Sequence, residues 1–495
     1  MKELQGLFLG EIRDDSMDKY KRLFSNTLIF AIGTFGSKLL AFFLMPLYTN
    51  VLTDAQYGTS DLLQQSANLL VPLVTFGITD AVIRFGLDRK VRNSEVLTTG
   101  ILTTLAGFCL LFLCFPLLEL IPGLDGYTHI LLIFVMTSST RQLFQQFVRA
   151  KGQVKLYAVD GILSTALTLL FTILFLVGFH WGVEGYLAAI ICADGCSCLF
   201  LMFNGQILGY FHPSYLRGKR TMKDMLRYSI PMIPNTVFWW VTTVSSRYII
   251  TAIMGEGANG LYAAAYKWPS AIILISTIFM NAWQMSAISE EKGRAQFFTH
   301  VFHGLSSLVF IVGSFLILFS KVITRIMVAD SYYESWQYIP LLSVATVYSC
   351  MVTFLGTVYV VNKKSTLSLA TTAAGAIVNV VLSFFLISYF GINGAAFAMF
   401  ASYFVVFLLR AYDTKRFIHM RIGGFRITVN TLLLLAQAFV MIYEITYWIP
   451  VEIFLTAAMV LLNLSGLLAG MKKILPSRKK ASLLSGNLRP AVPVP

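Results

Sequence analysis

Long apolar segments, each about the length needed to cross a bilayer, dominate this sequence. A membrane-spanning helix needs roughly 20 predominantly apolar residues, and about fourteen such segments can be placed. Their approximate limits are 23–47, 58–83, 95–118, 128–149, 156–179, 183–206, 228–253, 259–286, 298–320, 338–361, 366–389, 393–412, 427–446 and 450–471. Lipid offers no hydrogen bonds to a bare backbone, so such segments must be helical. The sequence therefore predicts an all-α integral membrane protein.

Composition excludes a soluble globular protein. Hydrophobic residues make up 57% of the chain, charged residues only 13%, and the mean hydropathy is +0.72. These values lie far outside the range of soluble domains. The net charge of +14 would suit nucleic acid only if the basic residues were clustered on a soluble face. They are scattered between apolar segments instead, and we expect no nucleic-acid partner.

The distribution of Lys and Arg predicts the orientation. If the N-terminus is cytoplasmic, 32 of the 38 Lys and Arg residues fall in the N-terminus, the cytoplasmic loops or the C-terminal tail. The outer loops then carry only Lys321 and Arg325. Cytoplasmic loops are enriched in these residues, so we expect both termini in the cytoplasm.

An internal repeat with an offset of 209 residues divides the chain. Residues 182–185 (GVEG) match 391–394 (GING), Asn26-Thr27 matches Asn235-Thr236, and the turn expected at 56–58 matches 258–260 after a gap. Each copy holds an even number of spans, so both enter the membrane from the same side. This is a parallel repeat, with a central cavity between two six-helix lobes.

The repeat predicts the domain organisation. We expect a cytoplasmic segment at 1–22, an N-lobe at 23–206, a basic cytoplasmic linker at 207–227 and a C-lobe at 228–412. Two further spans follow at 427–471, and a cytoplasmic tail at 472–495.

Three segments carry a resemblance to a known family. They are LTDAQYG at 52–58, GITDAVIRFG at 77–86 and YFGINGAAFA at 389–398. With two lobes and two extra helices, the chain resembles the polysaccharide transporter family of O-antigen and exopolysaccharide flippases. That family belongs to the multidrug/oligosaccharidyl-lipid/polysaccharide exporter superfamily. The resemblance implies a multi-pass protein of the bacterial cytoplasmic membrane that flips a lipid-linked oligosaccharide.

Ionisable residues within the spans are candidate site residues. Each costs roughly 2.5 to 3.5 kcal/mol at a helix centre unless it has a partner, a cavity or a function. They include Lys38, Asp61, Arg141, Asp160, Asp194, Arg247 and Lys267. We expect them to border a polar cavity.

Helical spacing extends this set. Arg141, Gln145 and Arg149 recur every fourth residue, and Asp61, Gln65 and Asn68 share one face of an earlier span. The alternative is that the amides only join helices. The predicted substrate-binding residues are Lys38, Asp61, Gln65, Arg141, Gln145, Arg149, Arg247 and Lys267.

Two pairs have sharper predicted roles. Lys38 and Arg247 occupy equivalent repeat positions and could together bind a diphosphate. Asp61 and Asp80 are alternative ion-pair partners for them. Asp160 and Asp194 are candidates for carrying a coupling proton or sodium ion, and pairing with Arg141 is the alternative.

Motifs for other chemistry are missing from the sequence. The cysteines form no CxxC pair and the histidines offer too few ligands on one helix face, so we expect neither a metal nor a cofactor. No Walker A sequence or serine nucleophile motif is present, and we expect no enzyme activity.

Three function classes remain from the sequence. The first is the lipid-linked oligosaccharide flippase, including the related lipid II flippase. The second is a multidrug antiporter, which usually has twelve spans and prefers acidic cavities. The third is a glycan polymerase, which the absence of a long external loop disfavours. For a flippase we expect a monomer whose partners are membrane lipids, an anionic lipid-linked oligosaccharide, and the polymerase and glycosyltransferases of its pathway.

Overall fold

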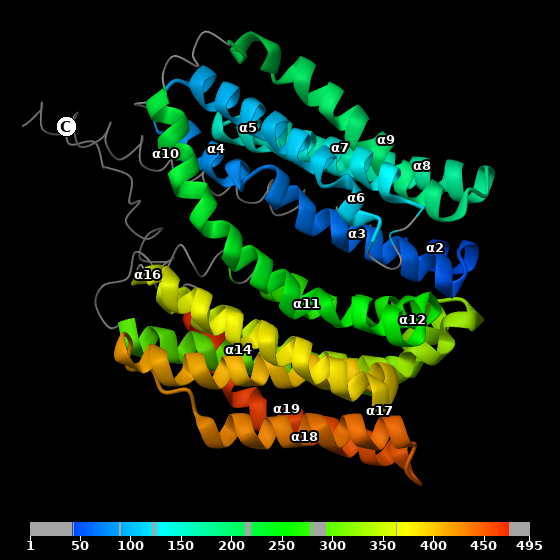
Figure 1. Cartoon of the computed structure of the whole chain (residues 1–495). Coiled ribbons are helices and arrows are strands. Elements are labelled where there is room, and N and C mark those ends of the chain that lie inside the picture. Colours follow the sequence, from blue (N-terminus) through cyan, green and yellow to red (C-terminus); the bar gives the residue numbers. More distant parts are fainter. Residues whose placement is uncertain are drawn as a thin grey trace, which may run out of the picture. The chain divides into compact units, whose positions relative to one another are not determined.

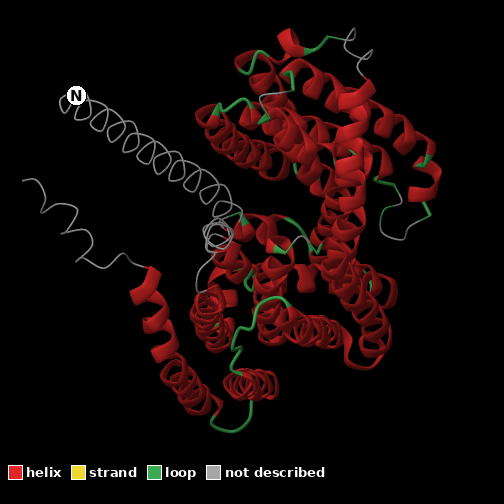
Figure 2. Cartoon of the chain, turned by 90° about the vertical axis from the view of Figure 1, so that its left-hand side faces the viewer, coloured by secondary structure: helices red, strands yellow, loops and turns green. Residues whose placement is uncertain are grey.

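The computed structural model describes residues 42, 44–88, 91–120, 124, 126–212, 219–277, 280, 294–362 and 364–474. Every regular element in this part of the chain is a helix (Figure 2). The all-α prediction is therefore confirmed. Among the described residues, eight helices are long and apolar enough to cross a membrane, or up to nine if one bent pair is a single span. The predicted number of fourteen stays a prediction, and most of the first predicted span lies outside the described residues.

The chain forms two compact units, which are described separately. Unit 1 comprises the residues up to Trp240 together with Ile250–Ala263 and Met327–Tyr332. Unit 2 comprises Val241–Ile249, Ala264–Ile326 and the residues from Tyr333 onward. The domain boundaries drawn from the repeat stay a prediction.

Unit 1 is a bundle of helices arranged around α7 (Figure 1). Its elements are α2 (Met45–Val51), α3 (Asp54–Val74), α4 (Ile78–Gly86), α5 (Asn93–Leu113), α6 (Phe115–Leu118), α7 (Thr128–Ala150), α8 (Val154–Thr172), a π-helical turn (Ile173–Gly178), α9 (Gly182–Asn204), a 3-10 turn (Ile207–Tyr210), α10 (Lys219–Ser229), a second 3-10 turn (Ile230–Met232) and parts of α11 (Ile233–Met254) and α12 (Glu256–Lys267). α7 packs against α3, α4, α5, α8 and α9.

The packing of α7 follows from its sequence. Leu143 and Phe147, one turn apart, are buried in a core shared with Val82, Leu97 and Met225. Arg141 and Gln145 lie on a different face of the same helix, and both are partly exposed. One face therefore holds the bundle together while the other is left for polar contacts.

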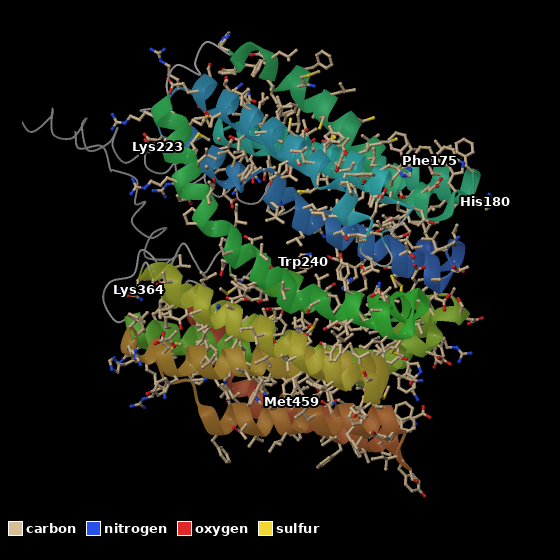
Figure 3. The ribbon with its side chains drawn as sticks, viewed as in Figure 1. Phe175, His180, Lys223, Trp240, Lys364 and Met459 are labelled. Carbon is tan, nitrogen blue, oxygen red and sulfur yellow. The ribbon has the colours of Figure 1, made fainter. Side chains whose placement is uncertain are left out.

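The connection between α8 and α9 and the helix α10 lie at opposite ends of unit 1 (Figure 3). Figure 3 shows Lys223, on α10, and His180, between α8 and α9, at opposite ends of this unit. The predicted alternation of inner and outer loops requires this separation.

A bend between α3 and α4 shapes the unit locally. Thr53 caps α3 through a capping box with Gln56, with hydrogen bonds of 3.1 and 3.2 Å. After Val74 the chain turns through left-handed backbone at Phe76 (φ 49°) and Gly77 (φ 62°), so α3 and α4 meet at 55°. Gly77 tolerates this conformation because it has no Cβ.

Two glycines support the internal repeat. Gly182 and Gly391, aligned by the 209-residue offset, both adopt left-handed φ values, 58° and 57°. Their partners Gly185 and Gly394 also have crowded Cβ positions, 3.2 Å from the carbonyl oxygen of Phe175 and 2.2 Å from that of Leu386. The backbone thus favours glycine at 182 and 391, and a side chain has no room at 394 and little room at 185.

Unit 2 contains the remaining helices. They are the rest of α11 and α12, α14 (Arg294–Leu318), α15 (Ser320–Met327), α16 (Ile339–Val361), α17 (Ser365–Asp413), α18 (Gly424–Tyr443) and α19 (Trp448–Ile474). α16 packs against α14, α17 and α18, and α14 also packs against α19. Gly391, whose backbone is not helical, divides α17 into two helices that correspond to the predicted spans 366–389 and 393–412.

Buried polar bonds fasten the two C-terminal helices. Asn430 on α18 and Asn463 on α19 exchange amide hydrogen bonds of 2.9 and 3.0 Å. Gln437 accepts a bond from Ser314 on α14 (2.8 Å) and donates one to Glu452 on α19 (3.0 Å). All five side chains are buried, so these bonds are shielded from water.

Two local expectations differ from the structure. Arg410, which the count of basic residues placed in the cytoplasm, is only 2% exposed, because its guanidinium donates to Val352 on α16 and to Thr371 and Thr372 in the first half of α17. Residues 56–58 and 258–260, expected as turns, lie in the first turns of α3 and α12. Glycine near a helix start resembles a turn signal in sequence.

Candidate functional site

A polar cavity of about 490 Å³ lies within unit 1. α3, α4, α7, α9 and the start of α11 supply its wall. The polar lining residues are Asn68, Thr79, Asp80, Ser138, Arg141, Gln142, Gln145, Asp194 and Thr236. Pro72 and Gly77, at the bend between α3 and α4, line it as well, so the bend contributes directly to its shape.

Arg141 is the centre of a hydrogen-bonded cluster that forms part of the wall of this cavity. Its guanidinium donates from Nη1 to Asp194 (3.1 Å) and from Nη2 to Asp160 (3.4 Å). Nε donates to the hydroxyl of Ser197 at 2.8 Å. The planar fork of Arg thereby joins α7 to α8 and α9, which the point charge of a Lys could not do in the same way.

Further polar groups complete the coordination of the two carboxylates. Gln145 donates to Asp160 at 2.9 Å, and Ser197 donates to the other oxygen of the same carboxylate. Ser138 donates to Asp194. Asp160 is therefore held by three side chains and Asp194 by two, so both buried acids are hydrogen-bonded.

Burial and charge define what the cluster can do. The Asp160 side chain is 0% exposed, that of Asp194 is 8% exposed and that of Arg141 is 22% exposed. With both acids ionised, one guanidinium faces two carboxylates, which leaves a formal surplus of one negative charge. In a low-dielectric interior such a surplus favours the uptake of one positive charge.

The second predicted polar stripe forms along α3. Gln65 donates to Asp61 (3.3 Å), and Asn68 donates to Gln65 (3.2 Å). Trp240, on α11 and labelled in Figure 3, donates its indole N–H to the backbone carbonyl of Gln65 at 2.8 Å. Of the three stripe residues, Asn68 lines the cavity, whereas Asp61 and Gln65 do not.

The other predicted site residues lie elsewhere. Arg149 is exposed at the end of α7, 5.6 Å from the ring centroid of Tyr157, and does not line the cavity. Arg247 is 3% exposed and belongs to unit 2, where its guanidinium lies over the ring of Tyr266 at 5.2 Å. Lys267 ends α12 in unit 2, and Lys38 lies outside the described residues.

Several contributing residues were not singled out from the sequence. Ser138 lies one turn before Arg141, and Ser197 lies one turn after Asp194. Helical spacing from the charged residues would have pointed to both, because residues three apart share a face. Thr79 and Thr236 carried no comparable signal.

Comparisons with known proteins bear on this site. A family model described as polysaccharide biosynthesis protein matches residues 23–284. The solved structure of the lipid II flippase MurJ in an inward closed conformation aligns with a TM-score of 0.65 at 14% identity, covering 88% of this chain and 98% of the flippase. A search of curated protein sequences finds no match.

Two other transporters have a similar fold. An inward-facing multidrug resistance MATE family transporter of the MOP superfamily aligns with a TM-score of 0.61 at 15% identity, over 77% of this chain and 94% of its own. A MOP superfamily transporter from Pyrococcus furiosus aligns with a TM-score of 0.55 at 13% identity, over 79% of this chain and 95% of its own. At these identities the likeness shows a shared fold alone.

Proposed function

Because the chain belongs to the polysaccharide biosynthesis protein family, we propose that it is a flippase for a lipid-linked oligosaccharide. Its substrate would be a repeat unit on undecaprenyl diphosphate, moved from the cytoplasmic to the outer leaflet by alternating access. The observation that carries the proposal is the polar cavity of unit 1, whose wall includes α9, a helix long and apolar enough to cross a membrane. A polar cavity between lipid-embedded helices is typical of a transport pathway.

The lining of the cavity suits a sugar. Hydroxyls of Thr79, Ser138 and Thr236 and amides of Gln142 and Gln145 offer both donors and acceptors. Sugar hydroxyls would exchange their bonds to water for bonds to these groups. A polar headgroup could then pass a hydrocarbon layer that it cannot enter alone.

We propose that Asp160 and Asp194 bind the coupling ion. The surplus negative charge around Arg141 would attract one proton or one sodium ion from the cavity, where Asp194 is part of the lining. With that charge bound, the carboxylates hold Arg141 less strongly. Its guanidinium is then available to an anionic substrate, so that ion and substrate favour each other's binding.

The diphosphate is assigned to the remaining cations. Lys38 and Arg247 stay our proposed phosphate ligands on their equivalent repeat positions. Arg247 is buried against Tyr266 in this structure, so phosphate binding there would require a different arrangement of α11 and its neighbours.

Reconstituted transport tests the proposal. Purified protein in liposomes is given a fluorescent undecaprenyl-diphosphate oligosaccharide, and outer-leaflet exposure is read by quenching with an impermeant reductant. We expect translocation that depends on a proton or sodium gradient. Asp160→Asn and Asp194→Asn should each uncouple it, whereas Asp224→Asn, an exposed acid on α10, should not. Gradient-independent flipping by both variants and wild type would refute the ion coupling.

The surplus negative charge also favours a second candidate function. Asp80 and Asp194 line the cavity together with only one cation, Arg141, which would suit an organic cation. The same liposomes loaded with ethidium distinguish the two. Ethidium export without oligosaccharide translocation would support a multidrug antiporter and overturn the flippase proposal.

A further inference from the structure

A second cavity, of about 880 Å³, lies in unit 2 between the second half of α17 and α18. Its wall is chemically unlike that of the first. On α17, apolar lining residues recur at helical spacing, and they include Phe397, Phe400, Ala401, Phe404, Phe407, Leu408 and Ala411. Ile427, Leu432 and Leu435 of α18 face them, and Leu408 and Leu432 are 50% and 61% exposed. The cavity is therefore an apolar groove open to its surroundings.

One end of this groove is cationic. Lys415 and Arg421 line it where α17 finishes and the chain leads to α18. Both are exposed, and neither forms an ion pair within the part of the chain that the structure describes. Arg416 differs, since it pairs with Asp413 at 3.6 Å and does not line the groove. Two positive charges without an ion-pair partner thus lie at one end of the apolar groove.

The groove is long enough to hold an acyl chain. From Phe397 to Ala411 the wall on α17 rises about 21 Å at 1.5 Å per residue. The hydrocarbon region of one leaflet is roughly 15 Å thick, so the groove covers the depth of one leaflet. Tyr412, 71% exposed, lies at the cationic end, as aromatic residues do at the level of lipid headgroups.

The floor of the groove is aromatic and suits an apolar ligand. Tyr348 is fully buried beneath it, and its hydroxyl is hydrogen-bonded to that of Thr431 at 2.6 Å. Because that bond satisfies the hydroxyl, the floor of the groove presents no unpaired tyrosine hydroxyl to an apolar chain. The rings of Phe400, Phe404 and Phe407 pack edge-on against it at 5.4 to 5.5 Å.

We propose that this groove binds one anionic glycerophospholipid of the cytoplasmic leaflet. Its phosphate would contact Lys415 and Arg421, and one acyl chain would lie along α17 over Tyr348. Two unpaired cations favour a net negative headgroup over a zwitterionic one, whose ammonium they would repel. The leaflet follows from the orientation that the basic loops predict. The inference concerns unit 2 alone and does not rest on the proposed function.

Native mass spectrometry of the full-length protein in detergent tests the site. The probes are phosphatidylglycerol and phosphatidylethanolamine, added at matched concentrations. We expect phosphatidylglycerol to be retained, about fivefold less by Lys415→Gln or Arg421→Gln and about thirtyfold less by the double variant. Arg416→Gln removes a charge from the same loop but not from the groove, so it should retain the lipid.

A second variant tests the apolar part. Ala401→Trp should fill the groove and displace the lipid while both cations remain, and its elution in gel filtration reports whether it is folded. Equal retention of phosphatidylglycerol by wild type, the double variant and Ala401→Trp would overturn the proposal. Stronger retention of undecaprenyl phosphate than of phosphatidylglycerol would also overturn it, by assigning the groove to the polyprenyl carrier.

Discussion

Within unit 1, Gly58 on α3 lies against the backbone of α12, and Gly260 on α12 lies against the backbone of α3. A Cβ on Gly58 would lie 2.0 Å from the carbonyl oxygen of Glu256, and a Cβ on Gly260 would lie 2.0 Å from that of Asp54. Hydrogen bonds surround the crossing, from Asn259 to the Gly58 carbonyl and from Thr59 to the Glu256 carboxylate, both 2.8 Å. The first turns of α3 and α12, aligned by the repeat, therefore meet with no room for a side chain.

Gly58→Ala and Gly260→Ala should each force these two helices apart. The added methyl group meets backbone, which cannot rotate away, so we expect a loss of about 1 to 3 kcal/mol of stability. The thermal midpoint of the purified protein measures it. Gly195→Ala on α9 is the control, because nothing lies within 4 Å of its Cβ position. Unchanged midpoints for both test variants would contradict this packing.

Removing the charge of Arg141 should destabilise the protein strongly. Arg141→Met leaves Asp160 and Asp194 buried without their cation, at a cost of about 3 to 5 kcal/mol. Adding Asp160→Asn and Asp194→Asn should restore most of the stability and leave transport absent. Arg220→Gln, which removes an exposed cation from α10, should change the thermal midpoint little. If the triple variant were no more stable than Arg141→Met, the charge argument would fail.

Arg410 should be essential to the packing of unit 2. It donates to the Val352 carbonyl (2.9 Å) and to Thr371 and Thr372 (3.0 Å each), tying α16 to both halves of α17. Arg410→Gln cannot span these acceptors, and we expect it to lower stability by about 2 kcal/mol or more. Thermal unfolding compares it with Arg416→Gln, whose side chain is 68% exposed. Equal midpoints would show that the buried bonds contribute nothing.

Thiol labelling should map the cavity of unit 1. In a background without the six native cysteines, Gln142→Cys and Gln145→Cys should react with a small hydrophilic reagent. Leu143→Cys and Phe147→Cys should stay unreactive, because both positions are buried in the core. Labelling is quantified by the mass shift of the intact protein. Protection at all four positions would mean that water does not reach α7.

The predicted orientation can be tested at three exposed positions labelled in Figure 3. An impermeant maleimide added to intact cells should label His180→Cys, between α8 and α9. Lys223→Cys and Lys364→Cys should be labelled only after the membrane is opened, because the basic segments that contain them are expected inside. Gel-shift of the labelled protein reads the result. The reverse pattern would invert the orientation.

Apolar length and helical spacing were enough to predict most helices and the polar face of α7. The pairing of Arg141 with Asp160 and Asp194 was open as an alternative to ion binding, since spacing cannot tell which spans are neighbours. Arg410 was misplaced because counting Lys and Arg by loop ignores depth. The groove between α17 and α18 could not be predicted, because its wall comes from two helices that are brought together by packing on α16.

The amide pair of Asn430 and Asn463 bears on how the chain is made. In a lone helix within lipid, each amide would present unsatisfied donors and acceptors to hydrocarbon, whereas together they satisfy one another. Only residues 444–447 separate α18 from α19, so the partner follows directly during synthesis. The last two helices are therefore suited to leave the insertion machinery as one hairpin. A chain truncated after α18 would expose the unpaired amide of Asn430 to the bilayer and would be a target for quality control.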